Sequence, residues 1–230
     1  MRLASIDILR AITMVLMIWV NDFWTLTNIP KWLQHANATE DYLGFSDIIF
    51  PLFLFIVGLS IPLAIQSRMD KGHTKFSITK HIIIRSISLL VIGFFMVNYE
   101  TAHDESIIIG AIYWELLMAL AVVLIWTNWK RSPLKKKWCP YLQALGFIIL
   151  IFLASIYKGG ENGSDWMTTQ WWGILGLIGW AYILNALVYV YSKGSLVIMS
   201  LLWLLLILLA VLNHSEMALE FKGFSGFFST

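Results

Sequence analysis

The chain has 230 residues, of which 59% are hydrophobic and only 13% are charged. Soluble domains are about 45–50% apolar and about 25% charged, and a soluble fold of this size could not enclose so many apolar side chains. A formal net charge of +2 gives no support to a nucleic-acid-binding surface. Because Cys139 is the only cysteine, an internal disulfide framework and a cysteine-based zinc site are excluded. The composition indicates an integral membrane protein.

Seven apolar stretches follow one another along the chain, each about as long as a helix that crosses a bilayer. They are predicted at residues 5–24, 47–65, 82–98, 107–127, 140–157, 171–191 and 195–213. The apolar runs are continuous and too long for membrane strands, which need about 9–11 residues. We therefore predict an all-α integral membrane protein, with one helical domain over residues 1–213 and an outward-facing tail over 214–230. No small-residue cleavage pattern follows the first stretch, so we expect it to remain as a span.

Basic residues are concentrated in alternate connections between these spans. The two connections after the second and the fourth span contain Arg68, Lys71, Lys75 and Lys80, and Lys130, Arg131, Lys135, Lys136 and Lys137. Cytoplasmic loops of membrane proteins carry an excess of lysine and arginine. The pattern predicts that the N-terminus and these two connections are cytoplasmic, and that the connections after the first, third and fifth spans and the tail lie on the outer side.

Polar side chains at both ends of the first span are candidates for a functional site, because such groups are costly inside a bilayer. Asp7 and Arg10 are three residues apart, so they share one face of a helix and can pair. Arg10 could instead meet an anionic ligand that enters from the cytoplasm, for which a planar guanidinium is well suited. Asn21 and Asp22 end the span on the outer side, either as an interfacial cap or as part of a site.

Three further residues are candidates in the outer half. His35 is the only histidine of the first outward connection, and an imidazole can take up and release a proton near neutral pH, unless it is merely solvated. Asp47 opens the second span ahead of Pro51, where it either caps the helix or belongs to a site. Glu115 lies about two turns into the fourth span and is a site candidate or a buried hydrogen-bonding partner.

Two other patterns, a repeat of glycines and the remaining histidines, do not by themselves indicate a functional site. Gly173, Gly176 and Gly179 recur at three-residue intervals in the sixth span, which favours close approach of another helix. The remaining histidines show no recognisable metal-ligand spacing, so no metal site is predicted.

An ordered set of residues in the first two spans resembles the heparan-α-glucosaminide N-acetyltransferase family and its bacterial relatives. The resemblance is strongest over residues 2–68, in RLASIDILRAITMVLMIWVND at 2–22, the loop histidine, and DYLGFSDIIFPLFLFIVGLSIPLAI at 41–65. The matching positions are Arg2, Ser5, Asp7, Arg10, Val20, Asn21, His35, Ala36, Asp47, Ile48, Ile49, Phe50 and Pro51. Relatives usually carry more spans than the seven predicted here, so we expect a fragment or a shortened member.

The resemblance implies a membrane-bound acyltransferase that moves an acetyl group from cytoplasmic acetyl-CoA to an amino sugar or sugar hydroxyl on the outer side. His35 would act at the reaction centre as a base or as a nucleophile that carries the acetyl group. Asn21 would hydrogen-bond the acetyl carbonyl, Asp47 would hold the imidazole tautomer, and Arg10 would meet the CoA phosphates.

The alternative is a non-catalytic membrane transporter or binding protein on the same helices. Both hypotheses place the chain in a lipid bilayer, which we take to be a bacterial inner membrane, and neither requires nucleic acid. They also leave open whether the chain forms a homo-oligomer. The enzyme hypothesis requires His35, Asn21 and Asp47 to converge on one site.

Overall fold

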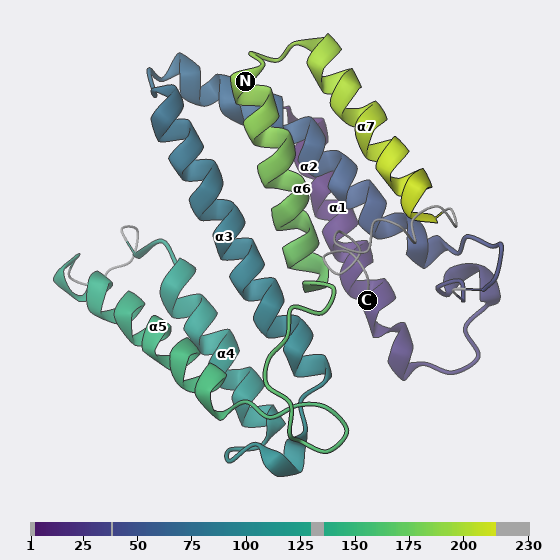
Figure 1. Cartoon of the computed structure of the whole chain (residues 1–230), viewed down its shortest axis with the longest axis vertical. Coiled ribbons are helices and arrows are strands. Elements are labelled where there is room, and N and C mark those ends of the chain that lie inside the picture. Colours follow the sequence, from purple (N-terminus) through teal and green to yellow (C-terminus); the bar gives the residue numbers. More distant parts are fainter. Residues whose placement is uncertain (1–2, 38, 130–135, 215–230) are drawn as a thin grey trace. The chain divides into compact units, whose positions relative to one another are not determined.

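A computed structural model describes residues 3–37, 39–129 and 136–214 (Figure 1). Its α-helices are α1 (Ala4–Asn21), α2 (Phe45–Asp70), α3 (Lys75–Glu100), α4 (Ala111–Trp126), α5 (Cys139–Ile156), α6 (Gly173–Tyr191) and α7 (Leu196–His214). Every apolar stretch predicted from the sequence is therefore a helix. In the described ranges, β structure is limited to isolated bridges that join Ala102 to Gly159 and Gly159 to Asp165.

The all-α membrane class predicted from the sequence is confirmed. By length and composition, α1, α2, α3, α5 and α6 are long and apolar enough to cross a membrane. α4 and the Leu196–Leu212 part of α7 are also apolar but shorter. The predicted tail, 214–230, lies almost entirely outside the described residues, as do the lysines and arginine of 130–135.

Contacts divide the chain into two compact units, and the first contains, among the described residues, those up to Ser86 together with the segment from Ile178 to the end of α7. Within it, α1 packs along α2. A buried cluster joins α2, the beginning of α3 and the end of α6 through Ile61, Ile65, Ile78, Ile82, Ala186 and Val190. Because these side chains recur on one stripe of each helix, the polar residues of the same helices are left at the outer faces and ends.

The second unit contains the rest of α3, the α4–α5 hairpin, the connection that follows it and the beginning of α6. Trp114 of α4 is completely buried and donates from its indole N–H to the Leu153 carbonyl at 3.0 Å. Its ring stacks on Phe95 and Tyr99 of α3. The buried amide of Asn98 exchanges two hydrogen bonds with the Thr168 backbone, at 2.8 and 2.9 Å, and so anchors the connection to α3.

The predicted close approach at the glycines of α6 is confirmed within this second unit. A Cβ placed on Gly93 of α3 would overlap the backbone of Gly176 and of Trp172. Glycine is thus required on α3 as well as on α6. The spacing of glycines in the sequence predicted the contact surface on α6 but not its partner Gly93 on α3.

We expect Gly93→Ala to lower the free energy of unfolding by about 1–3 kcal/mol, since the added methyl group must push two backbones apart. The melting temperature of the purified protein in detergent measures this effect. Gly58→Ala is the matched control, because a Cβ at Gly58 in α2 meets nothing within 4 Å. Equal melting temperatures for the two variants would contradict the packing argument.

Candidate active site

The connection between α1 and α2 folds back onto the first turn of α2. Its short 3₁₀ helix, Lys31–Leu33, is followed directly by Gln34 and His35. The buried Ser46 hydroxyl of α2 donates to the Leu33 carbonyl at 2.5 Å. Gly44 lies against the Gln34 carbonyl so closely that a Cβ there would overlap it. These two contacts hold the backbone just before His35 against the start of α2, and so fix the position from which the His35 side chain extends.

The Asp47 carboxylate, in the first turn of α2, organises this loop. Its Oδ2 accepts the backbone N–H groups of Ala36 at 3.0 Å and of Gly44 at 2.9 Å. Its Oδ1 lies 2.7 Å from Nδ1 of His35. The sequence left open whether Asp47 caps the helix or belongs to a site; the structure shows that one carboxylate contacts both the helix N-terminus and the histidine.

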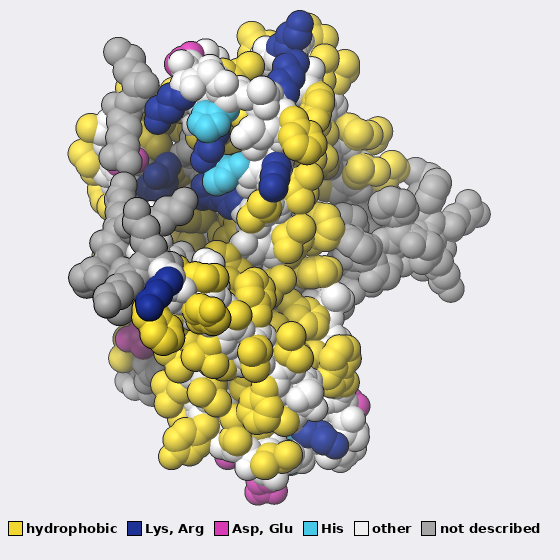
Figure 2. Space-filling model, turned by 90° about the vertical axis from the view of Figure 1, so that its left-hand side faces the viewer, with side chains coloured by type: hydrophobic (Ala, Val, Ile, Leu, Met, Phe, Trp, Pro, Cys, Tyr) yellow, Lys and Arg dark blue, Asp and Glu magenta, His cyan; other side chains and the backbone are white. Residues whose placement is uncertain are grey.

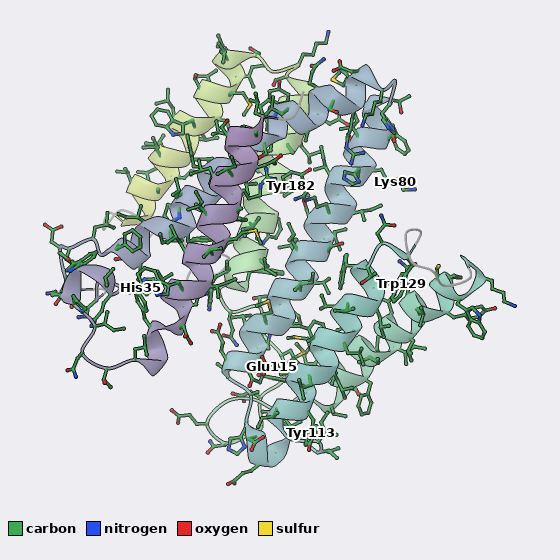
Figure 3. The ribbon with its side chains drawn as sticks, turned by 180° about the vertical axis from the view of Figure 1, so that it is seen from behind. His35, Lys80, Tyr113, Glu115, Trp129 and Tyr182 are labelled. Carbon is green, nitrogen blue, oxygen red and sulfur yellow. The ribbon has the colours of Figure 1, made fainter. Side chains whose placement is uncertain are left out.

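This contact determines which nitrogen of His35 can meet another molecule. An ionised carboxylate only accepts hydrogen bonds, so Nδ1 carries the proton that is donated to Asp47. Nε2 is then the ring nitrogen with a lone pair when the imidazole is neutral. The His35 side chain is 48% exposed, whereas that of Asp47 is 21% exposed. The pair therefore presents a base with a fixed tautomer at the surface of the α1–α2 connection (Figure 3).

A second polar contact ties down the far part of the same loop. Lys31 donates to Glu40 at 3.2 Å, and its ammonium group lies 5.3 Å from the centre of the Tyr42 ring. The hydrogen bond from Lys31 is the main reason that the pKa of Glu40 lies below its ordinary value. The pair therefore persists at neutral pH and is lost only when acidification protonates Glu40.

Asn21, predicted to share the site, is the exposed last residue of α1. Two residues earlier, Trp19 packs against Phe45 of α2 with a ring separation of 6.3 Å, so the end of α1 lies beside the start of α2. In the part of the chain that the structure describes, no hydrogen bond joins Asn21 to His35 or Asp47. The structure thus joins two of the three predicted site residues directly and leaves Asn21 on the neighbouring helix end.

Arg10 lies at the other end of the α1–α2 pair. The predicted pairing with Asp7 is confirmed at 3.3 Å, and the second guanidinium nitrogen donates to the Ser60 hydroxyl of α2 at 2.6 Å. A pocket of about 220 Å³ surrounds this contact, lined by Leu3, Ile6, Asp7, Arg10, Ser60, Leu63, Ala64 and Ser67. Ser60 follows Asp47 by 13 residues along α2, which corresponds to about 20 Å of helix. The pocket and His35 are therefore at opposite ends of two adjacent helices.

Glu115 belongs to a different environment, in the second unit. It is half-buried in α4 and lies close enough to the Tyr99 hydroxyl of α3 to act on it electrostatically. Tyr99 itself stacks on Trp114, so Glu115 lies beside the aromatic packing of the second unit, apart from His35 and Asp47.

Residues 2–226 match a family model described as heparan-alpha-glucosaminide N-acetyltransferase, catalytic. The chain belongs to this family. Its resemblance to heparan-alpha-glucosaminide N-acetyltransferases is thus confirmed over nearly the whole length. The human protein of that name is 36% identical over 97 residues, and the mouse protein 33% identical over 97 residues. Each aligned segment is 42% of this chain but only 14% of the relative. No solved structure matches the chain.

Sequence reasoning missed three contacts in this member of the heparan-alpha-glucosaminide N-acetyltransferase family. Each contact joins a residue of α2 or its N-cap to a partner that is distant in sequence: Gly44 to Gln34, Ser46 to Leu33 and Ser60 to Arg10. In the sequence, only the position of Ser46 next to Asp47 indicated that one of these residues belongs near the site.

We expect Gly44→Ala to displace the Gln34–His35 segment, because the new methyl group would overlap the Gln34 carbonyl. Hydrogen exchange over the α1–α2 connection should become faster by about tenfold or more, as one stabilising loop contact of about 1.4 kcal/mol is lost. Gly58→Ala again serves as the control. Unchanged exchange in Gly44→Ala would show that the loop does not depend on this contact.

Proposed function

We propose that the chain is a membrane-embedded acetyltransferase of a bacterial inner membrane, with acetyl-CoA on the cytoplasmic side as donor. The acceptor is an amino sugar or a sugar hydroxyl on the outer side, and His35 lies at the reaction centre. Family membership supports acetyl transfer, and the printed name of the human and mouse relatives supports an aminosugar acceptor. The observation that carries the proposal is the 2.7 Å contact between Asp47 and Nδ1 of His35.

The chemistry that we propose for His35 requires only its own ring and Asp47. Nε2 takes the proton of the acceptor amine or hydroxyl while that nitrogen or oxygen attacks the thioester carbonyl. The carbon–sulfur bond breaks, the acetyl group forms an amide or an ester, and CoA leaves as a thiolate that collects a proton. Alternatively, Nε2 itself attacks and carries the acetyl group until the acceptor replaces it. Trapping an acetylated His35 in the absence of acceptor distinguishes the two routes.

The Asp7–Arg10–Ser60 contacts support a donor site at the cytoplasmic end. A guanidinium binds phosphate through charge-assisted, bidentate hydrogen bonds, and Arg10 already has an ordered position beside a pocket. We propose that the CoA phosphates bind at Arg10 and that the thioester extends along α1 and α2 towards His35. Asn21, at the end of α1, then hydrogen-bonds the acetyl carbonyl.

The donor part of this proposal is tested by calorimetry. We expect acetyl-CoA to bind the purified protein, and Arg10→Gln to weaken that binding about tenfold or more, because a hydrogen bond to a charged group contributes about 1.5–3 kcal/mol. Lys193→Gln removes an equal charge from the exposed α6–α7 turn and should leave binding unchanged. Absence of acetyl-CoA binding in the wild-type protein would favour a non-catalytic transporter or binding protein.

A further inference from the structure

A second basic cluster extends from the end of α2 along the first half of α3, apart from Arg10. Arg68, near the end of α2, contacts Nε2 of His81 on α3 at 2.8 Å. One turn further along α3, the Arg85 guanidinium lies 5.1 Å from the centre of the Tyr182 ring of α6. All four residues belong to the first unit. Figure 2 shows two histidines among lysine and arginine side chains at this end of α3, and Figure 3 labels Tyr182 and Lys80 there.

The contact between Arg68 and His81 determines which nitrogen of the His81 ring carries the proton. Arginine has no acceptor, so Nε2 of His81 must accept the hydrogen bond from Arg68. The imidazole is therefore neutral and carries its proton on Nδ1, which is a donor. Arg68 and Arg85 both act electrostatically on this ring. Arg68, Arg85 and His81 thus present hydrogen-bond donors from two guanidinium groups and one imidazole, with no free acceptor among these three side chains.

Among the residues that the structure describes, no carboxylate forms an ion pair with these arginines. The ion pairs found in the described ranges are Asp7 with Arg10, Glu40 with Lys31 and Asp47 with His35. Asp70, the acidic residue nearest to Arg68 in sequence, accepts instead from the Gln66 amide at 2.8 Å. A pair of arginines beside a neutral histidine is therefore suited to an anion that comes from outside the chain.

The position of Arg85 indicates where that anion is found. Arg85 is ten residues into α3, about 15 Å from the start of the helix, and is exposed, as is the neighbouring Ile84 with 53% of its surface. An exposed arginine inside an apolar helix extends its charged group towards the membrane interface while its methylene groups contact lipid. Basic pockets between helices on the cytoplasmic side bind the head groups of anionic lipids.

We propose that Arg68, His81 and Arg85 bind the phosphate of an anionic phospholipid of the cytoplasmic leaflet. The two guanidinium groups and Nδ1 of His81 donate to the phosphate oxygens, and the acyl chains lie along the exposed apolar side chains of α3. This inference goes beyond the acetyl transfer proposed above and does not rest on it, because the residues differ from Asp7, Arg10 and Ser60.

The test uses the purified full chain in detergent, titrated with phosphatidylglycerol or with phosphatidylcholine of the same acyl chains and followed by native mass spectrometry. We expect phosphatidylglycerol to bind about tenfold more tightly in the wild-type protein, a preference that Arg68→Gln with Arg85→Gln removes. Lys137→Gln with Lys193→Gln, which also removes two positive charges, should keep the preference. If the double arginine variant does not fold, Arg85→Lys should still reduce the preference severalfold, because lysine keeps the charge but lacks the planar fork.

Three results would overturn this assignment. Equal affinity of the wild-type protein for the two lipids would show that no anion is selected. An equal loss in the lysine pair would show that only net charge matters. Displacement of phosphatidylglycerol by free CoA would assign the cluster to the phosphates of a soluble ligand instead of a lipid.

Discussion

Replacing His35 by alanine is expected to lower kcat for acetyl transfer by about 10²–10⁴-fold, the usual contribution of a positioned acid–base group. The affinity for acetyl-CoA should change by less than about twofold, because the proposed phosphate contacts lie at the other end of α1 and α2. Product formation from radiolabelled acetyl-CoA measures the rate, and calorimetry measures the affinity.

His103→Ala is the matched control for this experiment. His103 also lies in a connection predicted to face outward, but its Nδ1 is 2.9 Å from the Ser106 hydroxyl in the second unit, and no carboxylate of the described ranges forms an ion pair with it. Full activity in His35→Ala, with normal membrane insertion, would remove His35 from the reaction. Equal losses in both histidine variants would indicate a general effect on folding.

Asp47→Asn is expected to reduce kcat by a similar factor, about 10²–10⁴-fold, although the residue does not itself meet the acceptor. The carboxylate accepts from His35, Ala36 and Gly44, whereas an amide has one oxygen and one NH₂ group. If the oxygen keeps the backbone contacts, the NH₂ group faces Nδ1 and forces the proton to Nε2, which removes the lone pair required for catalysis.

The nitrogen-15 NMR shifts of the labelled imidazole show directly which ring nitrogen carries the proton. A variant that only disturbed the fold would not exchange the shifts of Nδ1 and Nε2. Asp41→Asn is the control, since Asp41 is an exposed carboxylate of the same connection. A variant Asp47→Asn that keeps both wild-type activity and the wild-type tautomer would contradict the proposed role of Asp47.

The helices could be predicted from apolar length alone, but their ends could not. α2 continues to Asp70 and α3 begins at Lys75, beyond the predicted 47–65 and 82–98. Lysine, arginine and glutamine interrupt the apolar run there, yet they are good helix formers, so the helices extend into the polar region. In contrast, α4 begins at Ala111, after the predicted 107, because Gly110 has a φ of 77° and Asp104 accepts the Ala111 N–H at 2.6 Å.

Within the candidate site, local spacing predicted local contacts. Asp7 and Arg10 pair because they are three residues apart on one helix. The contact between His35 and Asp47 spans 12 residues of loop, and it depends on Gly44 and Ser46 bringing that loop back to α2. The family resemblance indicated both residues, whereas hydropathy and spacing could not have joined them.

The exposure of the His35–Asp47 pair has one more consequence. The carboxylate accepts three hydrogen bonds on its two oxygens and is 21% exposed, whereas the imidazole side chain is 48% exposed. A base at this position, as we propose for His35, can exchange its proton directly with the aqueous phase on its own side. Acetyl transfer by this route needs no proton wire through the bilayer, and its proton exchange would not depend on the transmembrane potential.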